Sequence, residues 1–405
     1  MRTSVQRVRL LAAAALVITN FPSIVAAGDN DPRRVISSTI PKNGDLNPYG
    51  IVFVPDGFGD RESREQRGEG EQGSLKPGDV LVTNFNNKAN LQGLGTTIIK
   101  LNPDGPVAQP VPVGQPGHAV TFFESPLRGL TTAFGVLQAG LFVVGNMPTT
   151  DGTSGTVQQG ALQIVDASGN VVTTLTHPKF LDGPWDLTIN DRGRSAQIFV
   201  SNVLNGTVSR LDVMIDASSI AIANMVTVAE GYTFRPDPSA LELGPTGLAY
   251  DPETDILYVA STADNKIFAV ADAGDALTPG NKGTVVFADQ RHLHGPLGLV
   301  FAPNGHLITA NGDAVNPDPA HPSEIVEFTK RGEFVREFSL DPALAAPFGL
   351  ATVLKDRSDS DNPPTFEDSS DFDFAAVNDN RNTVTVYHRI SDAFTKAATK
   401  TATAP

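Results

Sequence analysis

The stretch Gly244-Pro245-Thr246-Gly247-Leu248-Ala249-Tyr250-Asp251-Pro252, continued by Ile256-Leu257-Tyr258-Val259-Ala260-Ser261, carries the strongest fold signal in the chain. A proline and a glycine open an apolar strand, a turn follows, and a second apolar strand ends in a small polar residue. Proline and glycine favour turns, whereas β-branched and aromatic residues favour strands. With further apolar runs at residues 266–270 and 283–287, the stretch predicts one four-stranded unit.

The same pattern recurs along the chain in looser form. The residue before the first Leu or Ile of each copy marks the following positions: Gly50, Gly129, Asp186, Gly247, Gly298 and Gly349. The intervals of 79, 57, 61, 51 and 51 residues are somewhat longer than the roughly 40–50 residues of common propeller blades. Six such copies predict an all-β, six-bladed β-propeller. A stacked solenoid is the alternative, and four-stranded units opened by Pro and Gly favour blades.

The last copy shows three evident strands and ends near residues 384–387. Residues 34–40 (Arg-Val-Ile-Ser-Ser-Thr-Ile) have the composition of a strand. We expect this N-terminal strand to complete the sixth blade, because the pairing joins the chain ends and covers an exposed sheet edge.

The motifs Pro-x-Gly-Leu, Tyr258-Val259-Ala260-Ser261 and Asp264-Asn265-Lys266-Ile267 resemble those of the NHL-repeat group of six-bladed propellers, over roughly residues 47–388. The chain is also similar, more distantly, to the SMP-30/gluconolactonase propellers. In that family Asn, Asp and Glu side chains hold a divalent cation in the channel, so the resemblance implies a metal site that uses some of Asn146, Asn202 and Asn311. The chain departs from the family beside the first blade, where Asn47-Pro48-Tyr49-Gly50 replaces an acidic ligand.

Residues 1–27 have the pattern of a secretory signal. Three arginines precede the apolar run Leu10–Ile18, and Val25-Ala26-Ala27 supplies small residues for cleavage. The run is much shorter than the roughly 20 residues that a spanning helix needs. We expect cleavage near Ala27, a propeller over residues 28–390, a disordered tail over 391–405, and a monomer in the periplasm or secreted.

The charge balance bears on the class of partner. The net charge is −15, and removal of residues 1–27, whose only charged residues are three arginines, makes it −18. Such a surface repels nucleic acid and anionic membranes, so we expect neither a nucleic-acid partner nor a membrane span. The chain has no cysteine, which excludes disulfides and thiolate metal sites.

Two polar segments, residues 56–78 and 355–371, interrupt the first and sixth copies between their first and second strands. Because these blades are neighbours in a closed ring, we expect both segments to emerge side by side from one face. They are either solvated loops or a patch that docks a partner or attracts cations.

The second strands of the six copies end in Asn84, Asn146, Asn202, Ser261, Asn311 and Asn378. In a propeller these ends ring one mouth of the central channel. Ca²⁺ accepts about six to eight oxygen ligands, so Asn146, Asn202, Asn311, Asn378 and Asp186 are the predicted ligands of a Ca²⁺ ion. The alternative is that asparagine stands at these ends as a turn residue that bonds nearby backbone.

Other candidates for chemistry lie at the same predicted mouth. His294 is the candidate general base, because its reference pKa is about 6.5; the alternative is an ordinary loop histidine. Tyr49, Trp185 and Phe348 follow blade-opening prolines and, with Asn84, are the predicted residues of a ligand pocket. Packing between blades is the alternative for the aromatic side chains.

The chain has no Gly-x-Ser-x-Gly elbow, His-Glu-x-x-His motif or phosphate-binding glycine loop, which removes the common serine hydrolases, zincins and nucleotide enzymes. Two functions remain: a module that binds a small molecule or a protein at the channel face, and a metal-dependent lactonase or esterase with its site at the channel mouth. The missing acidic ligand favours the binding module. Whether the protein is an enzyme stays open.

Overall fold

The computed structural model describes residues 33–59, 75–102, 119–216, 219–354 and 372–390, all within one compact unit, Pro32–Pro405. The predicted signal segment (1–27) and tail (391–405) lie outside the described residues, as do residues 60–74 and 355–371 of the two polar segments.

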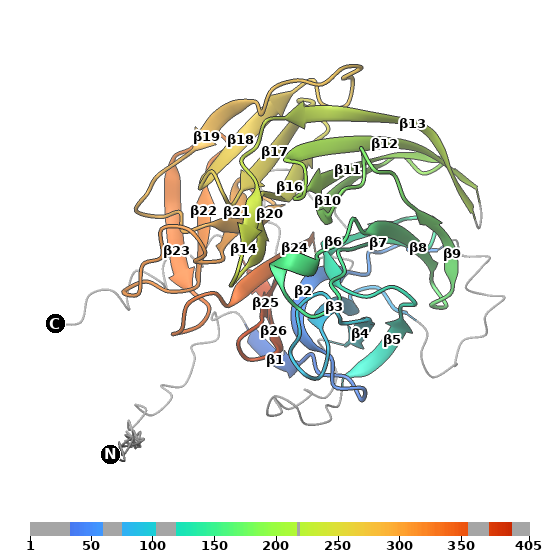
Figure 1. The fold of residues 1–405 in the computed structure, drawn as a ribbon, viewed down its shortest axis with the longest axis horizontal. Helices are drawn as coiled ribbons and strands as arrows, with labels where there is room; N and C mark the ends of the chain where they lie inside the picture. The colour runs from blue at the N-terminus through green and yellow to red at the C-terminus, as the bar shows by residue number, and fades with distance from the viewer. Residues whose placement is uncertain (1–32, 60–74, 103–118, 217–218, 355–371, 391–405) are drawn as a thin grey trace, which may run out of the picture. The chain divides into compact units, whose positions relative to one another are not determined.

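The described strands form six four-stranded antiparallel sheets, the blades, around a common centre (Figure 1). Blade 1 contains β2 (Leu46–Phe53), β3 (Val80–Asn86), β4 (Thr97–Leu101) and β5 (Val120–Glu124). Blade 2 contains β6 (Leu130–Leu137), β7 (Leu141–Asn146), β8 (Ala161–Asp166) and β9 (Val171–Leu175). Blade 3 contains β10 (Pro184–Asp191), β11 (Ser195–Asn202), β12 (Thr207–Asp216) and β13 (Ser219–Glu230).

The other three blades follow the same order. Blade 4 contains β16 (Pro245–Asp251), β17 (Ile256–Ser261), β18 (Lys266–Ala271) and β19 (Thr284–Phe287). Blade 5 contains β20 (Pro296–Phe301), β21 (Leu307–Asn311), β22 (Glu324–Phe328) and β23 (Phe334–Ser339). Blade 6 contains β24 (Pro347–Leu354), β25 (Phe372–Asn378), β26 (Thr383–Ile390) and β1 (Arg33–Ser38). The described residues include no α-helix, only the short 3-10 helix η1 (Ser154–Thr156). The predicted all-β, six-bladed propeller is therefore confirmed.

The N-terminal strand β1 is the outermost strand of blade 6. It pairs antiparallel with β26 over six residue pairs, from Arg33↔His388 to Ser38↔Thr383. Figure 1 shows β1, in blue, beside the red strands of the C-terminal end. Of the residues predicted to complete the last blade, 34–40, the first five pair there, and the strand begins one residue earlier, at Arg33.

Each blade opens with the same local device. In blades 2 to 6 the first residue of the inner strand pairs with the last residue of the second strand, as in Pro184↔Asn202 and Pro296↔Asn311, and a bulge follows at once. In blade 1 the bulge follows the pair Pro48↔Asn84, and the second strand continues to Asn86, two residues beyond its predicted end at Asn84. Proline fits this place because it lacks an N–H and tolerates the first position of a strand. We call the end of the ring where the inner strands begin the strand-start face.

Glycine follows the opening proline because neighbouring inner strands approach closely there. A Cβ on Gly247 would lie 2.1 Å from the carbonyl oxygen of Leu297 in the next blade. The corresponding distance is 2.4 Å from Gly298 to Phe348 and 2.1 Å from Gly349 to Tyr49. Real Cβ contacts of this length do not occur, so the repeated glycine is a condition of ring closure.

Blade 2 corrects the predicted repeat. The marker was placed at Gly129, but Gly129 precedes β6, and Leu130 is the residue that pairs with Asn146. Phe134 then pairs with Val144, which leaves three residues in the bulge where the other blades have two. Ala133 therefore occupies the marker position, and the extra residue explains why the pattern was read out of register.

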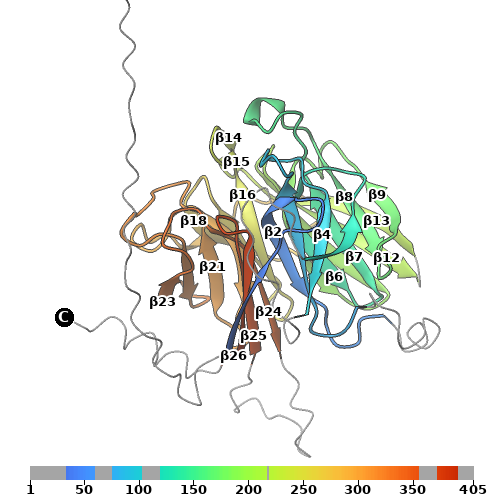
Figure 2. The same ribbon diagram turned by 90° about the horizontal axis from the view of Figure 1, so that it is seen from below.

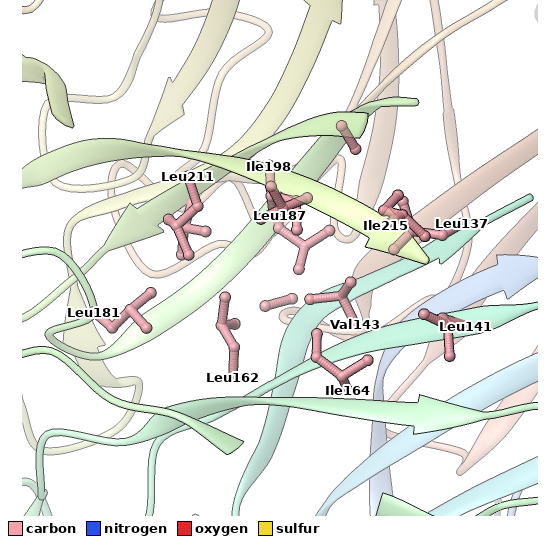
Figure 3. Packing of buried hydrophobic residues seen from close by; sticks show 14 residues of the cluster. Leu137, Leu141, Val143, Leu162, Ile164, Leu181, Leu187, Ile198, Leu211 and Ile215 are labelled. Atoms are coloured by element: carbon pink, nitrogen blue, oxygen red, sulfur yellow. The ribbon is translucent and has the colours of Figure 1, made fainter. Parts of the chain in front are cut away.

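The cores lie between the blades. One apolar cluster fills each of the six interfaces between neighbouring blades among the described residues. In the cluster between blades 2 and 3, Val143 and Leu162 face Leu187 and Ile198 (Figure 3). Inner and second strands are thus covered on both faces, which explains their continuous apolar runs.

A hairpin departs from the repeat between blades 3 and 4. Its strands are β14 (Arg235–Asp237) and β15 (Leu241–Leu243), which pair antiparallel. It lies beyond the start of β16, on the strand-start face (Figure 2). Its Leu241, at φ 66°, is buried in a cluster at that face, described below.

Candidate functional site

The strand-end asparagines are buried and bonded to backbone and side chains of their own blades. The Oδ1 atom of Asn202 accepts the N–H of Asp182 at 3.0 Å, and that of Asn311 accepts the N–H of His294 at 3.0 Å. The Nδ2 group of Asn146 donates to the carbonyl of Arg128 at 2.8 Å. Each of these partners lies in the loop that precedes the inner strand of the same blade, so each amide fastens the incoming loop to the second strand.

Asn84 and Asn378 follow the same rule. Asn84 Nδ2 donates to the carbonyl of Thr39 at 3.1 Å, and Asn378 Nδ2 donates to the carboxylate of Asp341 at 2.9 Å. Asn84 was predicted to line a ligand pocket, but the structure buries it fully in blade 1. The carbonyl oxygens of Asn84 and Asn146 are buried without a hydrogen-bond partner.

These contacts do not fit a Ca²⁺ site built from the predicted ligands. No two of Asn146, Asn202, Asn311, Asn378 and Asp186 share a hydrogen-bond partner among the described residues. The Oδ1 atoms of Asn202, Asn311 and Asn378, which a cation would need, accept backbone N–H groups instead. The described residues also contain no group of three or more His, Asp or Glu side chains able to hold a metal.

Aromatic side chains fill the centre of the strand-start face. Tyr49 stacks between Phe85 and Phe348, with ring centroids 4.5 and 4.2 Å apart and interplanar angles of 12°. Trp185 packs against Tyr49 at 5.7 Å, and Leu241 of the hairpin joins the same cluster. Tyr49 and Trp185 are buried and Phe348 is half-buried. We call these five residues the aromatic plug.

Buried polar groups lie next to the aromatic plug. Burial raises the pKa of the Tyr49 hydroxyl well above its usual value, and the nearby Asp379 carboxyl adds to the rise. Burial likewise raises the pKa of Asp379. The Nε1–H of Trp185 is buried without a partner. Three predicted pocket residues, Tyr49, Trp185 and Phe348, thus meet in one place, and they meet in packed contact.

A cavity of about 320 Å³ lies along the ring axis, lined by residues of all six inner strands. Its lining begins at the marker level, with Asp186, Gly298 and Gly349, and runs to residues such as Phe53 and Phe301 at the far ends of the inner strands. None of the plug residues lines it. The channel cavity therefore extends from below the plug toward the face opposite the strand-start face.

Asp186 stands at the inner end of this channel cavity, where four other blades have glycine. Its Oδ1 accepts the N–H of Leu187 at 2.8 Å, and its carboxylate also accepts the N–H of Leu248 from the next blade. Burial raises its pKa well above the usual range for a carboxyl group. No other Asp or Glu, and no Lys, Arg or His, is among the described residues that line the cavity.

His294 lies away from the channel cavity, in a buried polar cluster of blade 5. Its Nε2 is 3.4 Å from Glu324 Oε2, and its Nδ1 is bonded to the carbonyl of Asn316. Its neighbour His292 stacks on Phe334 at 3.8 Å and contacts Glu337 at 2.6 Å through Nδ1. Neither the cavity lining nor the plug includes His294, so its role as a general base stays a prediction without a substrate site beside it.

The sequence reading missed Glu324, the carboxylate partner of His294. Burial, and then the charge of Glu337, raise the pKa of Glu324 to about 7. The signal was present, because Glu324 and Glu327 bracket the apolar residues of the buried strand Glu324-Ile325-Val326-Glu327-Phe328. Buried carboxylates of this kind need partners.

Comparison with known proteins adds little beyond the fold. No family model matches the chain, and no curated protein matches its sequence. A putative oxidoreductase (glucose dehydrogenase) from Thermus thermophilus aligns with TM-score 0.47 and 12% identity, over 88% of this chain and 99% of that one. A gluconolactonase from Xanthomonas campestris aligns with TM-score 0.47 and 13% identity, over 89% and 90%.

The calcium-binding protein regucalcin from Agrobacterium tumefaciens aligns with TM-score 0.45 and 12% identity, over 87% of this chain and 93% of that one. Likenesses at this level carry no inference about activity, ligand or metal. Whether the repeats are NHL repeats stays a prediction. Within the described residues, no helix has the length and apolar character to cross a membrane.

Proposed function

We propose that the protein is an exported binding module that takes a small molecule into its channel cavity. The observation that carries the proposal is the cavity itself, which is lined by all six blades and holds one carboxyl group at its inner end. Its volume of about 320 Å³ falls at the lower end of the roughly 300–1,000 Å³ of small-molecule sites. Export rests on the signal pattern of residues 1–27.

The backbone supports binding in the channel. Each inner strand pairs with one neighbour in its own sheet and has no partner among the described strands on its other edge. Six strand edges with N–H and C=O groups therefore line the channel cavity, and such edges bind ligands through hydrogen bonds. The aromatic plug closes the strand-start side, so we expect the ligand to enter from the opposite face.

The hydrolase alternative is not favoured. It requires a channel cation held by the strand-end asparagines, whereas their amides are bonded within their own blades. The predicted general base is also not beside the channel cavity, because His294 lies in blade 5 next to Glu324 and is not among the lining residues. The binding module could instead bind a protein at the channel face, but nothing among the described contacts favours a protein over a small molecule.

A ligand screen with a blocked channel tests the proposal. A library of neutral, anionic and cationic molecules is screened by saturation-transfer NMR against the chain starting at Gly28. Thr188 lines the channel cavity, so Thr188→Trp should fill it and abolish the hits. Thr174→Trp, on the exposed side of outer strand β9, is the matched control and should keep them. Hits that survive Thr188→Trp, or no hits in the wild type, would sink the proposal.

A further inference from the structure

The Asp186 carboxyl group has no basic partner among the described residues that line the channel cavity. The carboxylate of Asp186 receives two backbone N–H groups, from Leu187 and Leu248, and no ion pair among the described residues. The described residues that line the cavity include no Lys, Arg or His. An anionic ligand would meet a carboxyl group with no base to balance it, whereas a cation would pair with that carboxyl group and favour its ionised form.

The remaining walls are not built for a metal ion. Besides Asp186, the side-chain oxygens of the lining belong to Thr132, Thr188, Thr352 and Tyr250. Three of them are already engaged: Thr132 donates to the carbonyl of Trp185, Thr352 to that of Phe301 at 2.9 Å, and Tyr250 to Asp255 at 2.8 Å. One carboxylate is too few for a hard divalent cation, which selects several oxygen ligands.

Apolar surface borders the same space. Four aromatic residues from four blades are among the lining residues: Phe53, Phe134, Tyr250 and Phe301. Their rings also pack in the apolar clusters between the blades. Phe53 and Phe301 are the last residues of β2 and β20, three residues beyond the marker level. At about 3.3 Å per strand residue, they lie about 10 Å along the axis from the level of Asp186. A bound molecule would therefore meet the Asp186 carboxyl group at the inner end and aromatic residues at the outer end.

We infer that the channel cavity binds a small organic cation, an alkylammonium whose charged nitrogen lies at Asp186 and whose apolar body lies between the aromatic residues toward the opposite face. Ammonium N–H groups pair with the carboxylate and with carbonyl groups of the unpaired strand edges. Aromatic surface accepts the alkyl part and is itself attractive to organic cations. This inference rests on the proposed function, because it names the ligand class of that same cavity.

Three probes of one shape test the inference: n-pentylamine, n-pentanol and pentanoate, each titrated by calorimetry into the chain starting at Gly28. At neutral pH they are a cation, a neutral molecule and an anion of similar size. We expect pentylamine to bind at least tenfold more tightly than pentanol, and pentanoate not to bind. Equal binding of pentylamine and pentanol would overturn the assignment of the cation, and leave the binding channel itself intact.

Two variants locate the charge. Asp186→Asn keeps the shape of the side chain and should weaken pentylamine at least tenfold while leaving pentanol unchanged. Asp191→Asn, at the far end of the same strand and outside the cavity lining, is the matched control and should bind like the wild type. Thermal unfolding of both variants checks that they fold, and the comparison of probes on the wild type stands without them.

The outcomes separate the two proposals. Loss of every probe and every screening hit would defeat the binding channel altogether. Pentylamine binding that persists in Asp186→Asn would place the cation elsewhere and overturn the inference alone. Calcium chloride is titrated in parallel, and Ca²⁺ binding that is lost in Asp186→Asn would replace the organic cation by a metal.

Discussion

Asn202 and Asn311 show what a strand-end amide does in this propeller. Each accepts the backbone N–H of the loop that precedes its inner strand, at 3.0 Å. The sequence was sufficient to place these residues on one face of the ring and to offer, as one alternative, that asparagine stands there as a turn residue. It was not sufficient to predict the direction of the amide, because side chains at one end of a strand point either to the channel or back to their own blade. Metal ligation was one alternative, and these contacts support the other.

Glu324 predicts a pH dependence of stability. Its side chain is 2% exposed, and burial followed by the charge of Glu337 raises its pKa to about 7. The groups that face it are Glu337, His294, His321 and Asn311. A carboxyl with a raised folded-state pKa stabilises the fold fully below its unfolded pKa, and this contribution is lost as the pH rises through the folded-state value. We expect the free energy of unfolding to fall between about pH 5 and pH 8, by an amount on the order of 2 kcal/mol.

Denaturant unfolding across this pH range measures the effect. Glu324→Gln should flatten the decline, because glutamine keeps the shape and cannot ionise. Part of the decline should remain, since burial also raises the pKa of Glu242 to about 7. A variant whose stability falls with pH as steeply as the wild type would show that Glu324 does not titrate in the folded protein.

At the scale of the element, the inner strands carry most of the sequence signal. The pattern Pro-x-Gly repeats in blades 1, 4, 5 and 6, at the first and third positions of the inner strand in blades 4, 5 and 6 and two residues later in blade 1. Proline tolerates this place because it lacks an N–H, and the close approach of the next blade excludes a Cβ at the glycine. Five markers were placed correctly on this basis. Blade 2 was not, because its bulge holds one more residue and its third position holds Ala133 rather than glycine.

Gly349 tests this reading of the inner strands. A Cβ at that position would lie 2.1 Å from the carbonyl oxygen of Tyr49, across the junction of blades 6 and 1. We expect Gly349→Ala to lower the free energy of unfolding by about 1–3 kcal/mol through overpacking. Gly155→Ala is the matched control, because its nearest neighbour would be Thr153 Oγ1 at 3.9 Å, and it should change stability by less than about 0.5 kcal/mol.

Thermal or denaturant unfolding distinguishes the two glycine variants. We expect the wild type and Gly155→Ala to have the same free energy of unfolding and Gly349→Ala to have a lower one. Equal stability of all three proteins would mean that blades 6 and 1 separate without cost and that the ring closure described here is wrong.

For the molecule as a whole, the repeat predicted the number of blades, their order and the pairing of the chain ends. The channel cavity was beyond reach of the sequence, because six strand edges that are far apart in the chain form it together. The prediction of a ligand pocket at the channel mouth failed for the same reason. Tyr49, Trp185 and Phe348 occupy equivalent places in three blades, and only their meeting at the ring axis shows that they fill the strand-start face and leave the binding space beneath them.

Asp186 shows both what the sequence could predict about the channel cavity and what it could not. The sequence singled it out as the acidic residue in a glycine position, and the structure places it at the inner end of the channel cavity. It was expected to join a ring of asparagines around a metal, yet its carboxylate bonds to backbone N–H groups of blades 3 and 4. The sequence was sufficient to select Asp186 as a candidate residue, but its hydrogen-bond partners could be identified only from the fold.

A crystal structure of the chain starting at Gly28, purified without chelators and soaked with n-pentylamine, tests the location of the site most directly. We expect density for the amine inside the channel cavity, with its nitrogen within hydrogen-bond distance of Asp186, and no ion bound to Asn202 or Asn311. An ion coordinated by the strand-end asparagines, with the channel cavity filled only by water, would contradict the proposed function and return the site to the mouth of the channel.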